Sequence, residues 1–194
     1  MRVVALWFAI MLLLTGPVLA VAPVNEATIA AAQDYGRSKA DMPLTLFLQP
    51  WTAYEEKADR LDDTAERACL YTPFLLLAAD ARDRTAAGDA VTAADAGKVL
   101  TDYNGYVIFG VTLSGLRADF AGNVSANLRQ GRKSLRPKMV RAQAAATEAA
   151  GGYQAQVYFY FASRGVATDK AARLTVSAAD GRQRVFMIPF AGYR

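Results

Sequence analysis

The sequence predicts an α+β protein, with a helical N-terminal part packed with a C-terminal antiparallel β-sandwich or barrel of about six strands. Apolar residues recur at helical intervals before about residue 104 and alternate with a period of two beyond it. The charge changes at the same place. Residues 23–100 carry 13 acidic and 8 basic side chains, whereas residues 101–194 carry 5 and 13. We therefore expect an acidic, mainly helical part (21–104) and a basic, mainly β part (105–194) that form one cooperative unit.

The first twenty residues have the pattern of a secretory signal peptide. Arg2 supplies a positive charge, and residues 3–14 form an apolar run shorter than the roughly 20 residues that span a bilayer. We expect cleavage after Ala20, with cleavage after Ala22 as a second choice and an uncleaved N-terminal anchor as the alternative. No later apolar run is long enough to cross a membrane. The mature chain is therefore expected to be secreted or periplasmic, without a transmembrane segment.

Residues 51–69 give the firmest helix prediction, because their apolar residues recur at intervals of three and four. Glu56 with Arg60 and Asp63 with Arg67 add pairs at spacing four, each with the acid before the base. The apolar stripe consists of Trp51, Tyr54, Ala58, Leu61, Ala65 and Ala68.

Three further helices are predicted from capping signals and composition. Thr72-Pro73 begins a helix over 73–87 that Gly88 ends, although its run of apolar residues at 74–77 also fits a buried strand. Thr92 and Asp95 form a capping box for a helix over 93–103. The alanine-rich residues 26–39 predict another helix, which Gly36 weakens near its end.

Strands are expected from residue 107 onward. Residues 107–113 are apolar on both faces, which predicts a strand buried on both sides. Residues 124–129 and 135–139 each have one apolar and one polar face. Pro137 has no N–H to donate, so the strand that contains it is expected at a sheet edge.

The remaining strands are aromatic or joined by a tight turn. Residues 153–162 predict an aromatic strand. Residues 174–178 are expected to pair with 185–190 across a turn at Asp180-Gly181, a dipeptide favoured in hairpins. Residues 142–152 are rich in alanine and glycine, which predicts a surface loop.

The composition excludes several kinds of site. The chain has no histidine and one cysteine, so Ser-His-Asp and Cys-His mechanisms and histidine-ligated zinc or iron are excluded. We expect no metal and no cofactor. Cys69 cannot form an intrachain disulfide. It is expected to be a small buried apolar residue, with an intermolecular disulfide as the alternative.

Four carboxylates fall at helical spacing within residues 51–69. On a helix they would form one stripe about 16 Å long, so only neighbouring pairs could cooperate. A solvated face is the preferred interpretation of this stripe. The alternative is a general acid and base pair, which would make the protein a carboxylate-dependent glycan hydrolase. The four residues are Glu55, Asp59, Asp62 and Glu66.

Six basic residues and no acid lie between positions 129 and 141. Such a segment attracts phosphates, anionic glycans or lipid headgroups, unless the acidic half neutralises it within the molecule or across a dimer. Nucleic acid is not an expected partner, because no nucleic-acid module is visible. The hypothesis is an exported, non-catalytic binding or assembly module of the cell envelope that contacts an anionic polymer, a lipid surface or a protein. The candidate residues, called the basic segment below, are Arg129, Arg132, Lys133, Arg136 and Lys138.

One face of the aromatic strand would carry Tyr158 and Tyr160 beside Gln154 and Gln156. If it were exposed, this face would suit sugar or peptide binding. The preferred interpretation is packing under the helices or against the second sheet, because aromatic residues are common in strands and cores.

The signal-peptide interpretation predicts an extracytoplasmic protein that begins at Val21. Intact-mass measurement and N-terminal sequencing of expressed protein check this prediction. An intact Met1 recovered in the membrane pellet would contradict it and favour the uncleaved anchor.

Overall fold

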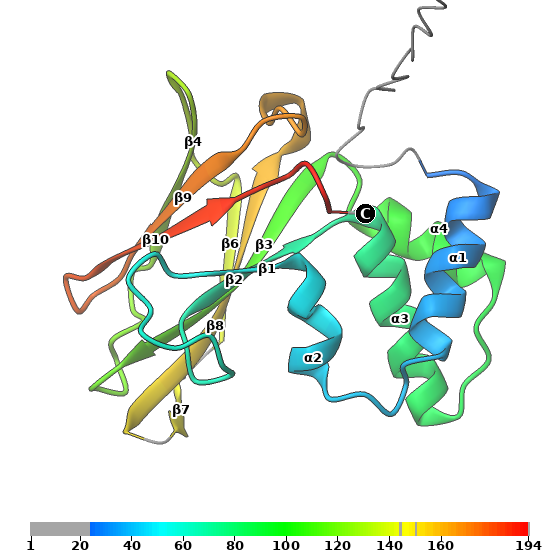
Figure 1. Ribbon diagram of the computed structural model, residues 1–194, viewed down its shortest axis with the longest axis horizontal. Coiled ribbons are helices and arrows are strands. Elements are labelled where there is room, and N and C mark those ends of the chain that lie inside the picture. The colour runs from blue at the N-terminus through cyan, green and yellow to red at the C-terminus, as the bar shows by residue number, and fades with distance from the viewer. Residues whose placement is uncertain (1–23, 144, 150, 194) are drawn as a thin grey trace, which may run out of the picture.

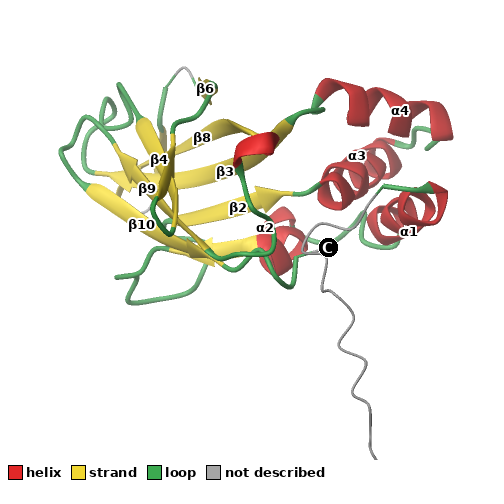
Figure 2. Ribbon diagram, turned by 90° about the horizontal axis from the view of Figure 1, so that it is seen from above, coloured by secondary structure: helices red, strands yellow, loops and turns green. Residues whose placement is uncertain are grey.

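The computed structural model describes residues 24–143, 145–149 and 151–193 (Figure 1). The predicted signal peptide lies outside the described residues. The α+β prediction is confirmed: the described residues contain four α-helices and ten strands, which form two antiparallel sheets. The helices lie at one end of the molecule, and the sheets form an open sandwich rather than a closed barrel (Figure 2). No helix in the described part of the chain has both the length and the apolar character that crossing a bilayer requires.

Side-chain caps begin three of the helices; those at Thr72 and Thr92 were predicted, whereas the cap at Asn25 was not. Helix α1 (Glu26–Arg37) begins at Asn25, whose side chain accepts a hydrogen bond from the Thr28 N–H. Helix α3 (Pro73–Ala87) begins at Thr72 and ends at Gly88, and α4 (Ala93–Asp102) carries the capping box. The helix predicted over 73–87 is therefore confirmed, and the strand alternative for residues 74–77 is wrong.

Gly36 allows α1 and α3 to approach each other closely. A Cβ atom at this position would lie 2.1 Å from the Ala78 carbonyl oxygen of α3. The residue that lowers the helix propensity of α1 is thus required by its packing. The short helix α2 (Leu44–Leu48) follows α1 and leads into a 3-10 turn (Gln49–Trp51).

The helix predicted over residues 51–69 is wrong. These residues form strand β1 (Thr52–Tyr54), a series of turns and the start of strand β2 (Arg67–Tyr71). Strand β2 pairs with β1 on one side and with β3 on the other. Side-chain pairs at spacing four stabilise a helix by only about 0.2–0.5 kcal/mol each, so sheet pairing and burial of β2 outweigh them.

The first sheet has the strand order β1-β2-β3-β8-β6, and β7 also pairs with β8. Its long central strands are β3 and β8, which pair along ten residues of each. The bounds are β3 Tyr106–Gly115, β6 Met139–Ala142, β7 Thr147–Ala149 and β8 Gly152–Ala162.

The second sheet has the order β10-β9-β4-β5. Strands β9 and β10 form the predicted hairpin across Asp180-Gly181. The bounds are β4 Ser125–Gln130, β5 Lys133–Leu135, β9 Ala172–Ser177 and β10 Gln183–Ile188.

The structure corrects two predictions along this part of the chain. Residues 135–139 are not one strand, because the chain leaves the second sheet after Leu135 and joins the first sheet at Met139. Pro137 lies in the crossover between these edge strands, where it has no ladder hydrogen bond to make. The predicted loop over 142–152 contains β7, which pairs with β8.

The two sheets enclose the larger apolar core. Alternate residues of β3 and β8 point inward, and they meet inward residues of β4, β9 and β10. A second core lies among the helices, where Trp51 stacks on Phe74 with ring centroids 6.1 Å apart. The inward residues of the sandwich include Phe109, Val111, Leu113, Val157, Phe159, Phe161, Leu128, Leu174, Phe186 and Ile188.

A buried ion-pair network joins the two sheets. Arg184, on the inward face of β10, is 1% exposed, and its Nε donates to Glu66 Oε1 at 2.9 Å. Glu66 directly precedes β2 of the first sheet. Nη2 of Arg184 donates to Asp180 at 2.6 Å and to the Ser114 carbonyl at 2.8 Å. The hydrogen bond from the Arg184 side chain holds the pKa of Asp180 below its ordinary value.

Replacement of Arg184 by methionine is expected to lower the free energy of unfolding by about 3–5 kcal/mol, because Glu66 and Asp180 would both lose their buried cation and Glu66 would keep only the exposed Arg182 as an ion-pair partner. Urea denaturation monitored by circular dichroism measures the loss. The control is Arg117→Met, which removes the exposed pair with Asp119 and should leave the midpoint unchanged. Equal midpoints for the two variants would show that the buried network does not stabilise the fold.

Candidate functional site

The basic segment lies on a hairpin and on the crossover that follows it. Arg129 is at the end of β4, Arg132 is in the turn, and Lys133 begins β5. Gly131 has φ 58° while Arg132 does not have a positive φ, which is the pattern of a type II′ hairpin turn. Arg136 and Lys138 occupy the crossover to β6. All five side chains are exposed.

None of these five cations forms a salt bridge with a carboxylate of the described residues. Salt bridges do join the acidic and the basic half of the chain, but they involve other arginines. Arg173 contacts Glu56 at 3.2 Å, and both Arg182 and Arg184 contact Glu66. Neutralisation of the basic segment by the acidic half of the same molecule is therefore not present among the described residues, whereas neutralisation across a dimer stays a prediction.

A groove of about 550 Å³ runs beside the crossover. Its floor is the outward face of the second sheet, where Ser125, Ser177 and Gln183 are neighbours across three strands. Arg136 is the one charged residue in its lining. The polar lining residues, called the polar groove below, are Ser125, Asn127, Arg136, Thr175, Ser177 and Gln183.

Most side chains of the polar groove have unused hydrogen-bonding capacity. Asn127 exchanges hydrogen bonds with Ser134 at 2.7 and 3.0 Å. The side chains of Ser125, Thr175, Ser177 and Gln183 make no hydrogen bond to another described residue. The groove thus offers hydroxyl and amide groups beside a guanidinium, an arrangement that suits a polyhydroxylated anion.

The four carboxylates singled out in the sequence do not form a stripe, because residues 51–69 are not a helix. Glu66 is buried in the network with Arg184, and Glu55 accepts from the Lys57 N–H at 2.7 Å. Asp62 accepts from the hydroxyl and the N–H of Thr64, which lower its pKa. A general acid near neutral pH needs a raised pKa, so the shift at Asp62 is in the wrong direction.

Asp59 lies exposed in the turns between β1 and β2. Within the described residues, no group of three or more Asp, Glu, Cys or His side chains is arranged to hold a metal ion. The helical stripe from which the hydrolase alternative was inferred is therefore absent, whereas the hydrolase alternative itself stays a prediction.

The tyrosine and glutamine face of β8 lies on the outward side of the first sheet. Tyr158 packs against Tyr71 with centroids 5.9 Å apart, and Tyr160 packs against Tyr106. Gln156 accepts a hydrogen bond from the Thr112 hydroxyl at 2.8 Å. Together with α2, Gln154, Gln156 and Tyr158 line an open groove of about 810 Å³. The face is thus partly packed rather than fully covered.

Sequence reasoning found the basic segment but missed the polar groove. Its hydroxyl groups come from β4 and β9, which are about fifty residues apart in the chain. The sequence did indicate that these residues lie on the outward face of each predicted strand. Their alignment depends on the register between strands, which the sequence pattern does not specify.

Comparisons of the chain with protein-family models, with curated proteins and with solved structures found no match. Functional inference therefore depends on the chemistry and geometry of the described residues.

Cys69 is buried in β2, and burial raises the pKa of its thiol to about 12. We expect the folded protein to resist alkylation by iodoacetamide at pH 8, because the reactive thiolate is scarce and covered. Mass spectrometry should show one adduct only after unfolding in guanidinium. Rapid alkylation of the native protein, or a disulfide-linked dimer on a non-reducing gel, would contradict this expectation.

Proposed function

We propose that the protein is an exported, non-catalytic binding module of the cell envelope, and that the basic segment and the polar groove bind an anionic polysaccharide. The observation that carries this proposal is the lack of internal partners. Five exposed cations within residues 129–138 have no salt bridge to a described carboxylate. Exposed charge of one sign attracts an oppositely charged polymer over about a Debye length, roughly 10 Å at 0.1 M salt.

The polar groove favours a polysaccharide over a lipid surface. Arg136 belongs both to the basic segment and to the groove, so the cationic surface continues into a concave strip of hydroxyl and amide groups. A sugar chain has hydroxyl groups to exchange hydrogen bonds with Ser125, Ser177 and Gln183. A lipid headgroup layer is attracted by cations on an exposed surface, and this attraction does not require a groove lined with hydroxyl and amide groups.

Reversal of Arg136 and Lys138 to glutamate is expected to weaken retention on immobilised polygalacturonate, an anionic polysaccharide. Each exposed ion pair contributes up to about 1 kcal/mol, so removal of two attractive pairs predicts a loss of affinity of up to about thirtyfold. Wild-type retention should also fall steeply between 50 and 300 mM NaCl. Binding isotherms at several salt concentrations provide the measurement.

The matched control is Arg60→Glu with Lys98→Glu, which changes the net charge equally in the acidic half. This variant should retain most of the wild-type affinity. Thr175→Val with Ser177→Ala tests the groove and should weaken polygalacturonate binding without affecting binding to phosphatidylglycerol vesicles. Equal losses in both charge variants would indicate an effect of net charge alone. Tight binding to vesicles with none to polygalacturonate would favour a lipid surface.

A further inference from the structure

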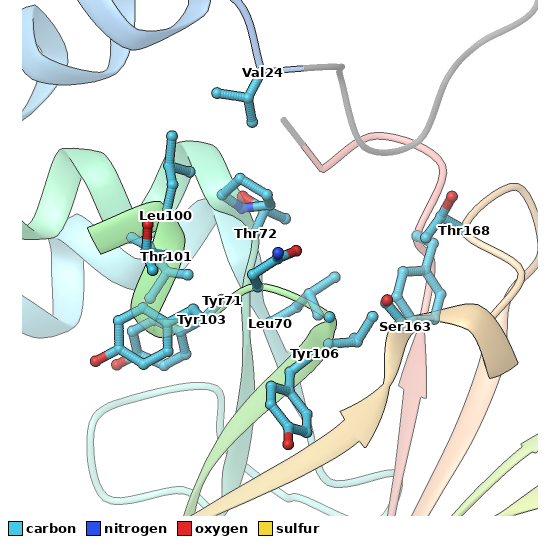
Figure 3. Close-up of a pocket in the computed structure, with 16 residues that line it drawn as sticks. Val24, Leu70, Tyr71, Thr72, Leu100, Thr101, Tyr103, Tyr106, Ser163 and Thr168 are labelled. Atoms are coloured by element: carbon cyan, nitrogen blue, oxygen red, sulfur yellow. The ribbon is translucent and has the colours of Figure 1, made fainter. Parts of the chain in front are cut away.

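A separate cavity of about 490 Å³ lies where the helical part meets the end of the sandwich (Figure 3). Its lining includes Leu70 and Phe190, which belong to the sandwich core. It also includes Tyr71 and Leu100, which pack against the helical core. Cavities at junctions between packed units are common ligand sites, and this volume is within their usual range of roughly 300–1,000 Å³.

Among the described residues, the lining of this seam cavity is mainly apolar and contains no charged residue. Leu70 and Phe190 are buried and form its floor, whereas Leu76, Leu100 and Val107 remain partly exposed on its walls. Hydroxyl and amide groups lie toward solvent, from the exposed residues Thr101, Asn104 and Ser163. A ligand would therefore bury an apolar body and keep its polar groups at the mouth.

The start of α3 lies in the cavity wall, and two of its first N–H groups are not available to an anion. Pro73, at the first helical position, has no N–H. The N–H of Leu75 is already donated to the Thr72 hydroxyl at 3.1 Å. With no cation among the described lining residues and two of the first N–H groups of α3 absent or used, burial of a charged ligand would be costly.

We propose that the seam cavity binds one neutral, mainly apolar small molecule with a hydrogen-bonding group at its outer end. A water molecule takes up about 30 Å³ in the liquid, so the volume corresponds to a ligand on the order of 15 non-hydrogen atoms. The cavity shares no lining residue with the polar groove. This binding is thus independent of the polysaccharide proposal and should not depend on salt.

Two fluorescent probes with the same ring system test the proposal on the processed protein. N-phenyl-1-naphthylamine is neutral, and 8-anilino-1-naphthalenesulfonate adds one sulfonate. We expect saturable binding of the neutral probe at one site per chain, at least about tenfold tighter than the anionic probe because no cation offsets burial of the sulfonate. Comparable or tighter binding of the sulfonate would overturn the claim that the site selects neutral ligands.

Substitutions that fill the cavity locate the site. Leu76→Trp and Leu100→Trp should each weaken binding of the neutral probe by about tenfold or more, because the added ring occupies the cavity. Leu116→Trp is the control, since Leu116 is 86% exposed and outside the lining; it should bind as the wild type does. Thermal melts verify that each variant is folded, and a folded variant is required for the comparison. Unchanged affinity in both filled variants, or no binding by the wild type, would overturn the proposal.

Discussion

The buried guanidinium of Arg184 constrains the rest of this fold. A charge that is 1% exposed must have partners for its hydrogen-bond donors, and these come from three separate segments. Glu66 precedes β2, the Ser114 carbonyl is near the end of β3, and Asp180 lies in the β9–β10 turn. The network therefore fixes the first sheet against the second at one end of the sandwich. It also positions the turns between β1 and β2, since the Glu56 N–H donates to the Val185 carbonyl of β10 at 2.9 Å.

The ion pairs around Glu66 also connect the acidic half of the chain to the basic half. Glu56 and Glu66 of the acidic half bind Arg173, Arg182 and Arg184 of the basic half. These contacts join the sheets, so the asymmetry contributes to the fold. They leave the basic segment without a described carboxylate partner, so these five cations take no part in the ion pairs that join the sheets.

The sequence predicted correctly those helices whose ends are defined by hydrogen bonds between residues close together in the chain. The caps at Thr72 and Thr92 and the stop at Gly88 define helices through groups within four residues of each other, and the structure has these helices. Residues 51–69 were misinterpreted because their helical spacing was real but their stabilising partners were distant. Cys69 lies opposite Gly110 of β3, about forty residues away. The Glu66–Arg184 contact spans 118 residues.

For the candidate binding surface too, the sequence predicted only the part that depends on neighbouring residues. A run of cations can be read directly from the sequence, and the basic segment was predicted in this way. The polar groove requires the register of β4, β9 and β10 together with the course of the crossover. The seam cavity requires the relative placement of two cores. Neither is encoded in a local pattern, so both became visible only when the strands and helices were placed in space.

Protection of sheet edges is the main competing explanation for the basic segment. Edge strands often carry lysine or proline because such residues prevent pairing with another molecule. This explanation fits Lys133 in β5, Pro137 in the crossover and Arg141 in β6, since β5 and β6 are the edges of the two sheets. It does not account for Arg132, which lies in a turn, or for Arg136, which lines the groove. Edge protection therefore accounts for only part of the basic segment, and the cations at Arg132 and Arg136 are the ones on which the proposal of an anionic ligand depends.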